Sequence, residues 1–182
     1  MILPFSTQLN GKPTYFVEKI LRAVINEHSH KVKGISEFIY DSGLKLNYNY
    51  AEDILSVIDH KVKPKLHTIR EDKKNRWKVG TKIDFFINCR QKDMFRFAPV
   101  LPVVSIQEIE IFWYSRLRLL EPSKLNKERY NYVEISVDGR LLTIKEISEL
   151  AIYDGFDSAE EFFNYFNSNF KGKLIHWTNI RY

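Results

Sequence analysis

The stretch Pro64–Arg70 reads Pro-Lys-Leu-His-Thr-Ile-Arg, and it constrains the fold more than any other part of the chain. Its apolar and β-branched residues predict a short strand over Leu66–Arg70. Lys65 and Thr68 stand three positions apart, so on a regular strand their side chains point to opposite faces. The two can meet only if the strand curls or if Lys65 lies in the preceding loop. Pro64 favours the loop.

This predicted strand lies inside a cluster of positive charge. Residues 61–78 include eight basic and two acidic residues, whereas the whole chain has 28 basic and 23 acidic residues and a net charge of +5. The remainder is therefore almost neutral. Such clustering is typical of a polyanion-binding surface, although a solvated lysine-rich loop gives the same pattern. The predicted nucleic-acid contacts are Lys63, Arg70, Lys73, Lys74, Arg76, Trp77 and Lys78.

Alternation of apolar and polar residues predicts further strands. After the candidate strand at residues 133–137, Asp138-Gly139 indicates a hairpin turn. In residues 103–113 the apolar phase shifts by one residue at Gln107-Glu108, which predicts a β-bulge. The strand candidates are residues 2–5, 83–87, 95–97, 103–113, 133–137 and 174–177.

Three helices are predicted at residues 14–27, 143–153 and 158–167. The first has apolar residues at helical spacing. The other two begin with capping boxes, Thr143 with Glu146 and Ser158 with Glu161, so they meet near residue 155. Strands and helices together predict an α+β domain in which helices pack around a curved mixed sheet.

Length and composition fit one globular domain over residues 1–182, with an ordered insertion at about 31–60. No apolar run reaches the roughly 20 residues needed to span a bilayer. The N-terminus does not resemble a signal peptide, and the single Cys89 cannot form an internal disulfide. A cytoplasmic location and no membrane association are expected.

No cofactor or metal is expected either. The cysteine and histidines do not have zinc-site spacing, and His28 and His30 have no evident third ligand.

Several short motifs together resemble the ASCH domains of the PUA-like superfamily. Lys-x-x-Thr-Ile-Arg at 65–70 is similar to the family's signature strand, and Lys78-Val79-Gly80 is similar to the lysine–x–glycine step that follows it. Val104–Ile111 and Leu150–Phe162 resemble the next long strand and the later acidic and helical segment, in family order. The resemblance covers most of residues 62–178. It implies a PUA-like mixed β-barrel of about five or six strands with flanking helices.

The resemblance also implies a site. The small 4-acetylcytidine amidohydrolases of this family use a lysine, a threonine and a carboxylate, which fall on Lys65, Thr68 and Asp154. The enzymes have glutamate where this chain has the shorter Asp154, and a displacement of about 1 Å can cost on the order of a hundredfold in rate. Independently, Asp154 lies near the C-terminal end of a predicted helix, where the dipole disfavours an anion. A nearby cation such as Lys65 is expected to offset that cost.

Three functions remain open. The first is a binding module that recognises RNA or a modified nucleoside through the basic stretch 61–78. The second is a hydrolase that acts on an acylated cytidine-type nucleoside or on RNA, with Lys65, Thr68 and Asp154 as its catalytic group. The third is binding of a protein partner through residues 31–60 or 114–132. The aspartate at 154 weakens the second and leaves the first unaffected.

Overall fold

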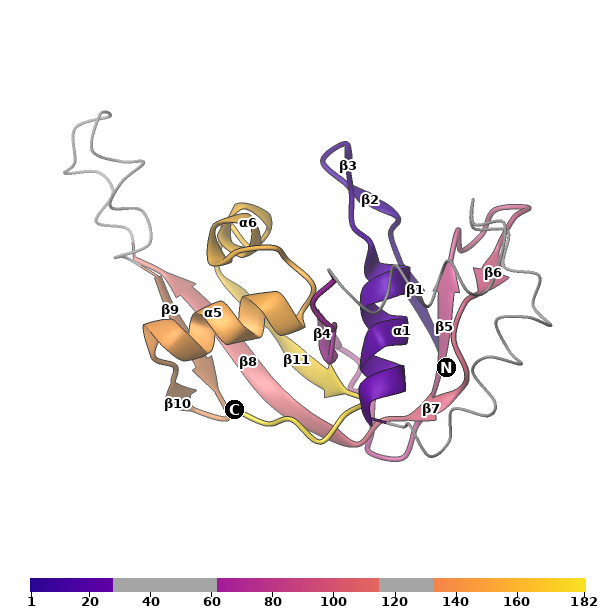
Figure 1. Cartoon of the computed structure of the whole chain (residues 1–182). Helices are drawn as coiled ribbons and strands as arrows, with labels where there is room; N and C mark the ends of the chain where they lie inside the picture. The colour runs from indigo at the N-terminus through magenta and orange to yellow at the C-terminus, as the bar shows by residue number, and fades with distance from the viewer. Residues whose placement is uncertain (28–61, 115–132) are drawn as a thin grey trace.

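A computed structural model describes residues 1–27, 62–114 and 133–182 (Figure 1). Within these ranges the chain is an α+β protein with three helices and with strands in separate sheets, which confirms the predicted fold class. The two histidines His28 and His30, the 31–60 insertion and nearly all of 114–132 lie outside the described residues. None of the described helices is long and apolar enough to cross a membrane.

The strands form two main sheets and a small hairpin. The first sheet contains β1 (Ile2–Phe5), β5 (Lys82–Ile87), β6 (Phe95–Arg96) and β7 (Leu101–Pro102), with β1 parallel to β5. The second sheet is antiparallel, in the order β10 (Arg140–Leu141), β9 (Val133–Val137), β8 (Ser105–Trp113), β11 (Phe170–His176), β4 (His67–Arg70). The hairpin pairs β2 (Gln8–Leu9) with β3 (Lys12–Pro13).

The two main sheets adjoin where β7 runs into β8. Val103 N donates to Thr81 O at 2.8 Å, and Val104 N donates to His176 O at 2.8 Å. On the other side, no ladder joins β1 to β4 among the described strands. There Arg70 Nη2 donates across the seam to Pro4 O at 2.7 Å. The described strands therefore do not form a closed barrel, and the predicted PUA-like barrel stays a prediction.

α5 and α6 begin where their capping residues place them. α1 spans Phe16–Glu27, α5 spans Ile144–Tyr153 and α6 spans Ala159–Tyr165, close to the predicted bounds. Thr143 and Glu146 make the complete capping box of α5. The Ser158 side chain accepts from Glu161 N at the start of α6. Side chain and orphan amide satisfy each other in both caps, so the sequence pattern was enough to place them.

Two hydrophobic cores lie along the molecule. The first packs α1 against β1 and β5 and includes Trp77 and Trp177. The second packs α5 and α6 against the second sheet, with Phe162 and Ile109 among its fully buried side chains. Figure 1 shows α1 over the first sheet and α5 with α6 over the second.

The predicted β-bulge in β8 is wrong. The strand pairs with β11 in an unbroken register from Ser105 to Ile111, and with β9 from Ile109 to Trp113. Gln107 lies in the same buried row as Ile109, whereas Ile106 faces the other way and packs against the first core. The apparent change of apolar phase arises because the long strand serves one core on each face.

Candidate functional site

Lys65 and Asp154 form a buried ion pair. Lys65 lies just before β4, in the loop that Pro64 favours. Its Nζ is 3.1 Å from Asp154 Oδ1 and also donates to the Asp154 backbone carbonyl. The two side chains are only 1% and 8% exposed. Backbone bonds from Lys65 N to Lys19 O and from Leu66 N to Tyr153 O, each 2.9 Å, fix this loop between α1 and α5.

Asp154 is the C-cap of α5, as its sequence position predicted. Lys65 supplies the cation expected there. Asp154 Oδ1 also accepts from Ile69 N at 2.9 Å, and His67 Nδ1 lies 3.6 Å from the same oxygen. One carboxylate oxygen thus links the end of α5 to β4, so the ion pair has a structural role in holding these two elements together.

Burial and mutual charge shift the pKa values of both partners. Burial lowers the pKa of Lys65 to about 8, although the Asp154 carboxylate opposes the change. Burial alone would raise the pKa of Asp154, but Lys65 and His67 outweigh it and hold that pKa below its ordinary value. At neutral pH both groups therefore carry charge, and each is the main compensation for the other.

The predicted triad is only partly assembled. Thr68 is buried on the opposite face of β4 from His67, where it pairs in register with Ile175. Within the described part of the chain, the hydrogen bonds of Lys65 and Asp154 do not extend to Thr68. His67 takes that place beside Asp154. It is fully buried, and its Nε2 lies 2.9 Å from the Tyr182 hydroxyl.

The predicted nucleic-acid contacts divide into an exposed set and a packed set. Arg70 donates to Pro4 O, and its guanidinium lies 5.4 Å from the centre of the Phe5 ring. Trp77 is 5% exposed and belongs to the first core, so it does not lie on the exposed basic surface with the other predicted contacts. The exposed set is Lys63, Lys73, Lys74, Arg76 and Lys78.

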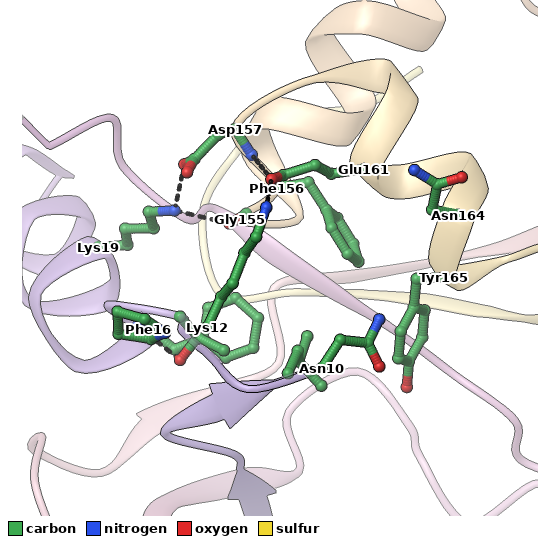
Figure 2. Close-up of a pocket in the computed structure, with 13 residues that line it drawn as sticks. Asn10, Lys12, Phe16, Lys19, Gly155, Phe156, Asp157, Glu161, Asn164 and Tyr165 are labelled. Carbon is green, nitrogen blue, oxygen red and sulfur yellow. Dashed lines mark hydrogen bonds and ion pairs between the residues drawn. The ribbon is translucent and has the colours of Figure 1, made fainter.

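Beside the ion pair lies a pocket of about 160 Å³ (Figure 2). The β2–β3 hairpin, the start of α1 and the α5–α6 turn enclose it. Gly155 and Phe16 form the wall nearest Lys65. The Lys65 Nζ lies 4.9 Å from the centre of the Phe16 ring, and a Cβ built on Gly155 would come within 3.0 Å of the Lys65 side chain. Lys65 thus supports the pocket wall from behind.

The pocket combines aromatic and polar groups. Its aromatic lining is Phe16, Phe156 and Tyr165. Lys19 is buried at the wall, where its Nζ donates to Gly155 O at 2.8 Å and to Asp157 Oδ1 at 2.7 Å. At the mouth the exposed Lys12 Nζ lies 3.7 Å from Glu161 Oε1, which Figure 2 shows as a contact between hairpin and α6. Asn10, Thr14 and Asn164 complete the polar lining.

Sequence reasoning missed this pocket. Asn10-Gly11 is a strong hairpin signal that predicts the β2–β3 turn, and both residues have positive φ, 51° and 76°. No local signal places that hairpin opposite Gly155, because the two segments are distant in sequence.

Within the described ranges, no three of histidine, cysteine, aspartate and glutamate gather as a metal-binding group. Comparisons of the chain with protein-family models, with curated proteins and with solved structures give no match.

Proposed function

We propose that this protein binds RNA through a modified or unmodified nucleoside held in the pocket and through phosphate contacts made by the loop 73–78. The observation that carries the proposal is the pocket lining of three aromatic rings and two side-chain amides. Aromatic faces stack on bases, and amides donate to and accept from base edges. A cavity of roughly 150 Å³ holds a benzene molecule, so this pocket has room for one six-membered ring.

The resemblance to ASCH domains supports the same proposal. In this proposal β1 and β4 border an open seam of a PUA-like barrel, and the Lys65–Asp154 pair corresponds to the lysine and the carboxylate that the resemblance implies. A cytoplasmic location belongs to this proposal too. The pair has a positioning role in it, because it holds the Asp154-Gly155 turn that forms the pocket wall.

Hydrolysis of an acylated cytidine-type nucleoside is the second candidate. The observation in its favour is the Lys65 pKa of about 8, which suits a lysine that exchanges a proton near neutral pH. Two observations weigh against hydrolysis. The Lys65 ammonium already donates to the Asp154 backbone carbonyl and to Asp154 Oδ1. Thr68 is not part of this hydrogen-bonded group among the described residues. Release of acetate from 4-acetylcytidine by the wild-type protein, lost in Thr68→Val, would favour hydrolysis over binding.

Truncation of Tyr165 tests the pocket. Tyr165 lines it and is 48% exposed, so Tyr165→Ala removes a stacking face without opening a core. We expect cytidine and 4-acetylcytidine to bind about 1–3 kcal/mol more weakly, as measured by calorimetric titration. Phe112→Ala is the matched control, because Phe112 is 50% exposed and outside the pocket lining. Equal loss in both variants, or no loss in Tyr165→Ala, would contradict the pocket assignment.

Charge reversal tests the loop. In Lys73→Glu/Lys74→Glu/Lys78→Glu, all three positions are exposed. If the wild-type protein neutralises about four phosphates, log K for oligouridylate should fall with log salt at a slope near −3. The triple variant should lose that slope and, at low salt, about a hundredfold in affinity. The control Arg90→Glu/Lys92→Glu/Lys145→Glu replaces three other exposed residues and makes the same change in net charge. It should keep most of the salt slope and most of the affinity for oligouridylate. Unchanged binding in the loop variant removes the loop from the proposal.

A further inference from the structure

A buried acid lies beneath the exposed basic loop. The Asp72 side chain is only 2% exposed, although its neighbours Glu71, Lys73 and Lys74 are exposed. Asp72 Oδ1 accepts from Arg76 N at 3.0 Å, and Asp72 Oδ2 accepts from Trp77 N at 2.9 Å. The carboxylate therefore closes the loop from inside by bonding to backbone amides four and five residues further on.

The loop is also attached to the two cores. Lys173, on β11 and only 9% exposed, lies with its Nζ 3.5 Å from Asp72 Oδ2 and donates to the Asn75 side-chain oxygen. Asn75 has a φ of 49° and its N donates to Asp72 O at 2.8 Å, which completes a tight turn. Trp77 then enters the first core. The backbone that carries Lys73, Lys74 and Arg76 is thus held at both ends and in the middle.

Electrostatics keeps Asp72 charged in this place. Burial opposes its ionisation, but the Arg76 and Trp77 amides and the Lys173 ammonium outweigh burial and lower the pKa of Asp72 below its ordinary value. A carboxylate beneath three exposed cations also weakens the attraction of the loop for any polyanion. The contacts of Asp72 with the Arg76 and Trp77 amides and with Lys173 nevertheless hold the loop in one conformation.

We propose that Asp72 is a positioning residue for the phosphate-contacting loop, so that removing this negative charge weakens RNA binding. The inference rests on the proposed function. A loop that is already ordered does not lose conformational freedom when its lysines meet phosphates, and this ordering costs affinity in a mobile loop. From net charge alone, removing an acid should strengthen RNA binding. The positioning role of Asp72 predicts the opposite, that its removal weakens binding.

The test compares two acids that are adjacent in sequence. Glu71 is 56% exposed and its Oε1 lies 3.0 Å from Lys73 Nζ, without any bond to the loop backbone. Glu71→Gln and Asp72→Asn change the net charge equally. We expect oligouridylate to bind Glu71→Gln as tightly as wild type or about twofold more tightly. Asp72→Asn should bind several-fold more weakly and Asp72→Ala about tenfold more weakly, each with a shallower salt slope.

Two further measurements separate positioning from loss of the fold. Hydrogen exchange at the Arg76 and Trp77 amides should quicken in both Asp72 variants and not in Glu71→Gln, while thermal unfolding shows which variants remain folded. Asp72→Asn keeps one acceptor oxygen, so it provides the comparison if Asp72→Ala does not fold. A folded Asp72→Asn that binds as tightly as Glu71→Gln overturns the positioning role. Unchanged binding in the Lys73/Lys74/Lys78 variant overturns the proposed loop contact instead, which keeps the two failures distinct.

Discussion

Replacing Lys65 by alanine should destabilise the protein by about 3–5 kcal/mol, because it leaves the Asp154 carboxylate in the interior without its ammonium partner. Lys65 is 1% exposed, so water cannot take the place of the lost cation without opening the structure. The hydrogen bond from Ile69 N to Asp154 Oδ1 remains, but an uncharged amide does not neutralise the carboxylate. Urea unfolding at neutral pH measures the change in the free energy of unfolding.

Two variants give this result its meaning. Lys145, 86% exposed and 3.9 Å from Glu149, is the exposed counterpart, and Lys145→Ala should cost less than about 1 kcal/mol. Lys65→Met/Asp154→Asn removes both charges and should recover part of the loss, because the uncompensated carboxylate is gone. A cost for Lys65→Ala no larger than that of Lys145→Ala would mean that the pair is solvated in solution.

Local patterns predicted the elements because the physics behind them is local. A capping box joins residues three apart, so Thr143 with Glu146 located the start of α5 without any knowledge of its neighbours. The Asp138-Gly139 turn between β9 and β10 is equally local, with φ values of 50° and 79°. Even the meeting of Lys65 with Asp154 had a local cue, the cost of an anion at the end of a helix.

The rest depended on contacts between distant segments. β8 looked bulged because Ile106 and Ile109 face different cores, and nothing in the strand itself shows that a second core exists. Trp77 was a candidate nucleic-acid contact, although a tryptophan at such a position is more often a core anchor, and the structure places it in the first core. The pocket depends on Lys19 reaching Gly155, 136 positions away in the sequence.

Lowering the pH from about 7 to about 5 should remove roughly 2 kcal/mol of stability through the buried His176, and the buried His67 should add to the loss. His67 and His176 are both fully buried, with ring centres 5.2 Å apart. Burial lowers the pKa of His176 to about 3, and His67 and Arg181 add to the shift. Burial likewise lowers the pKa of His67, against the attraction of Asp154. The His176 ring is therefore neutral in the folded protein across this range, and the His67 ring takes up a proton less readily than in the unfolded chain.

Acid destabilises the folded protein because the unfolded chain takes up more protons. Unfolded histidines bind protons below about pH 6.5, whereas the folded ones do not until a lower pH, so acid favours the unfolded chain. The pKa values of the Asp154 and Glu146 carboxyls are held below their ordinary values in the folded protein. The stability that these carboxyls supply is lost only below the ordinary carboxyl pKa of about 4, so the change in unfolding free energy between pH 7 and pH 5 reports the histidines.

His176→Phe isolates one histidine. Among the described residues neither ring nitrogen of His176 has a hydrogen-bond partner, so an apolar ring of similar shape does not break a bond there. The variant should be at least as stable as wild type near pH 7, because two buried unpaired polar atoms are gone. Its loss of stability between pH 7 and pH 5 should be smaller by about 2 kcal/mol. Urea unfolding at both pH values measures this, and parallel slopes for the two proteins would show that His176 is protonated alike in the folded and unfolded states.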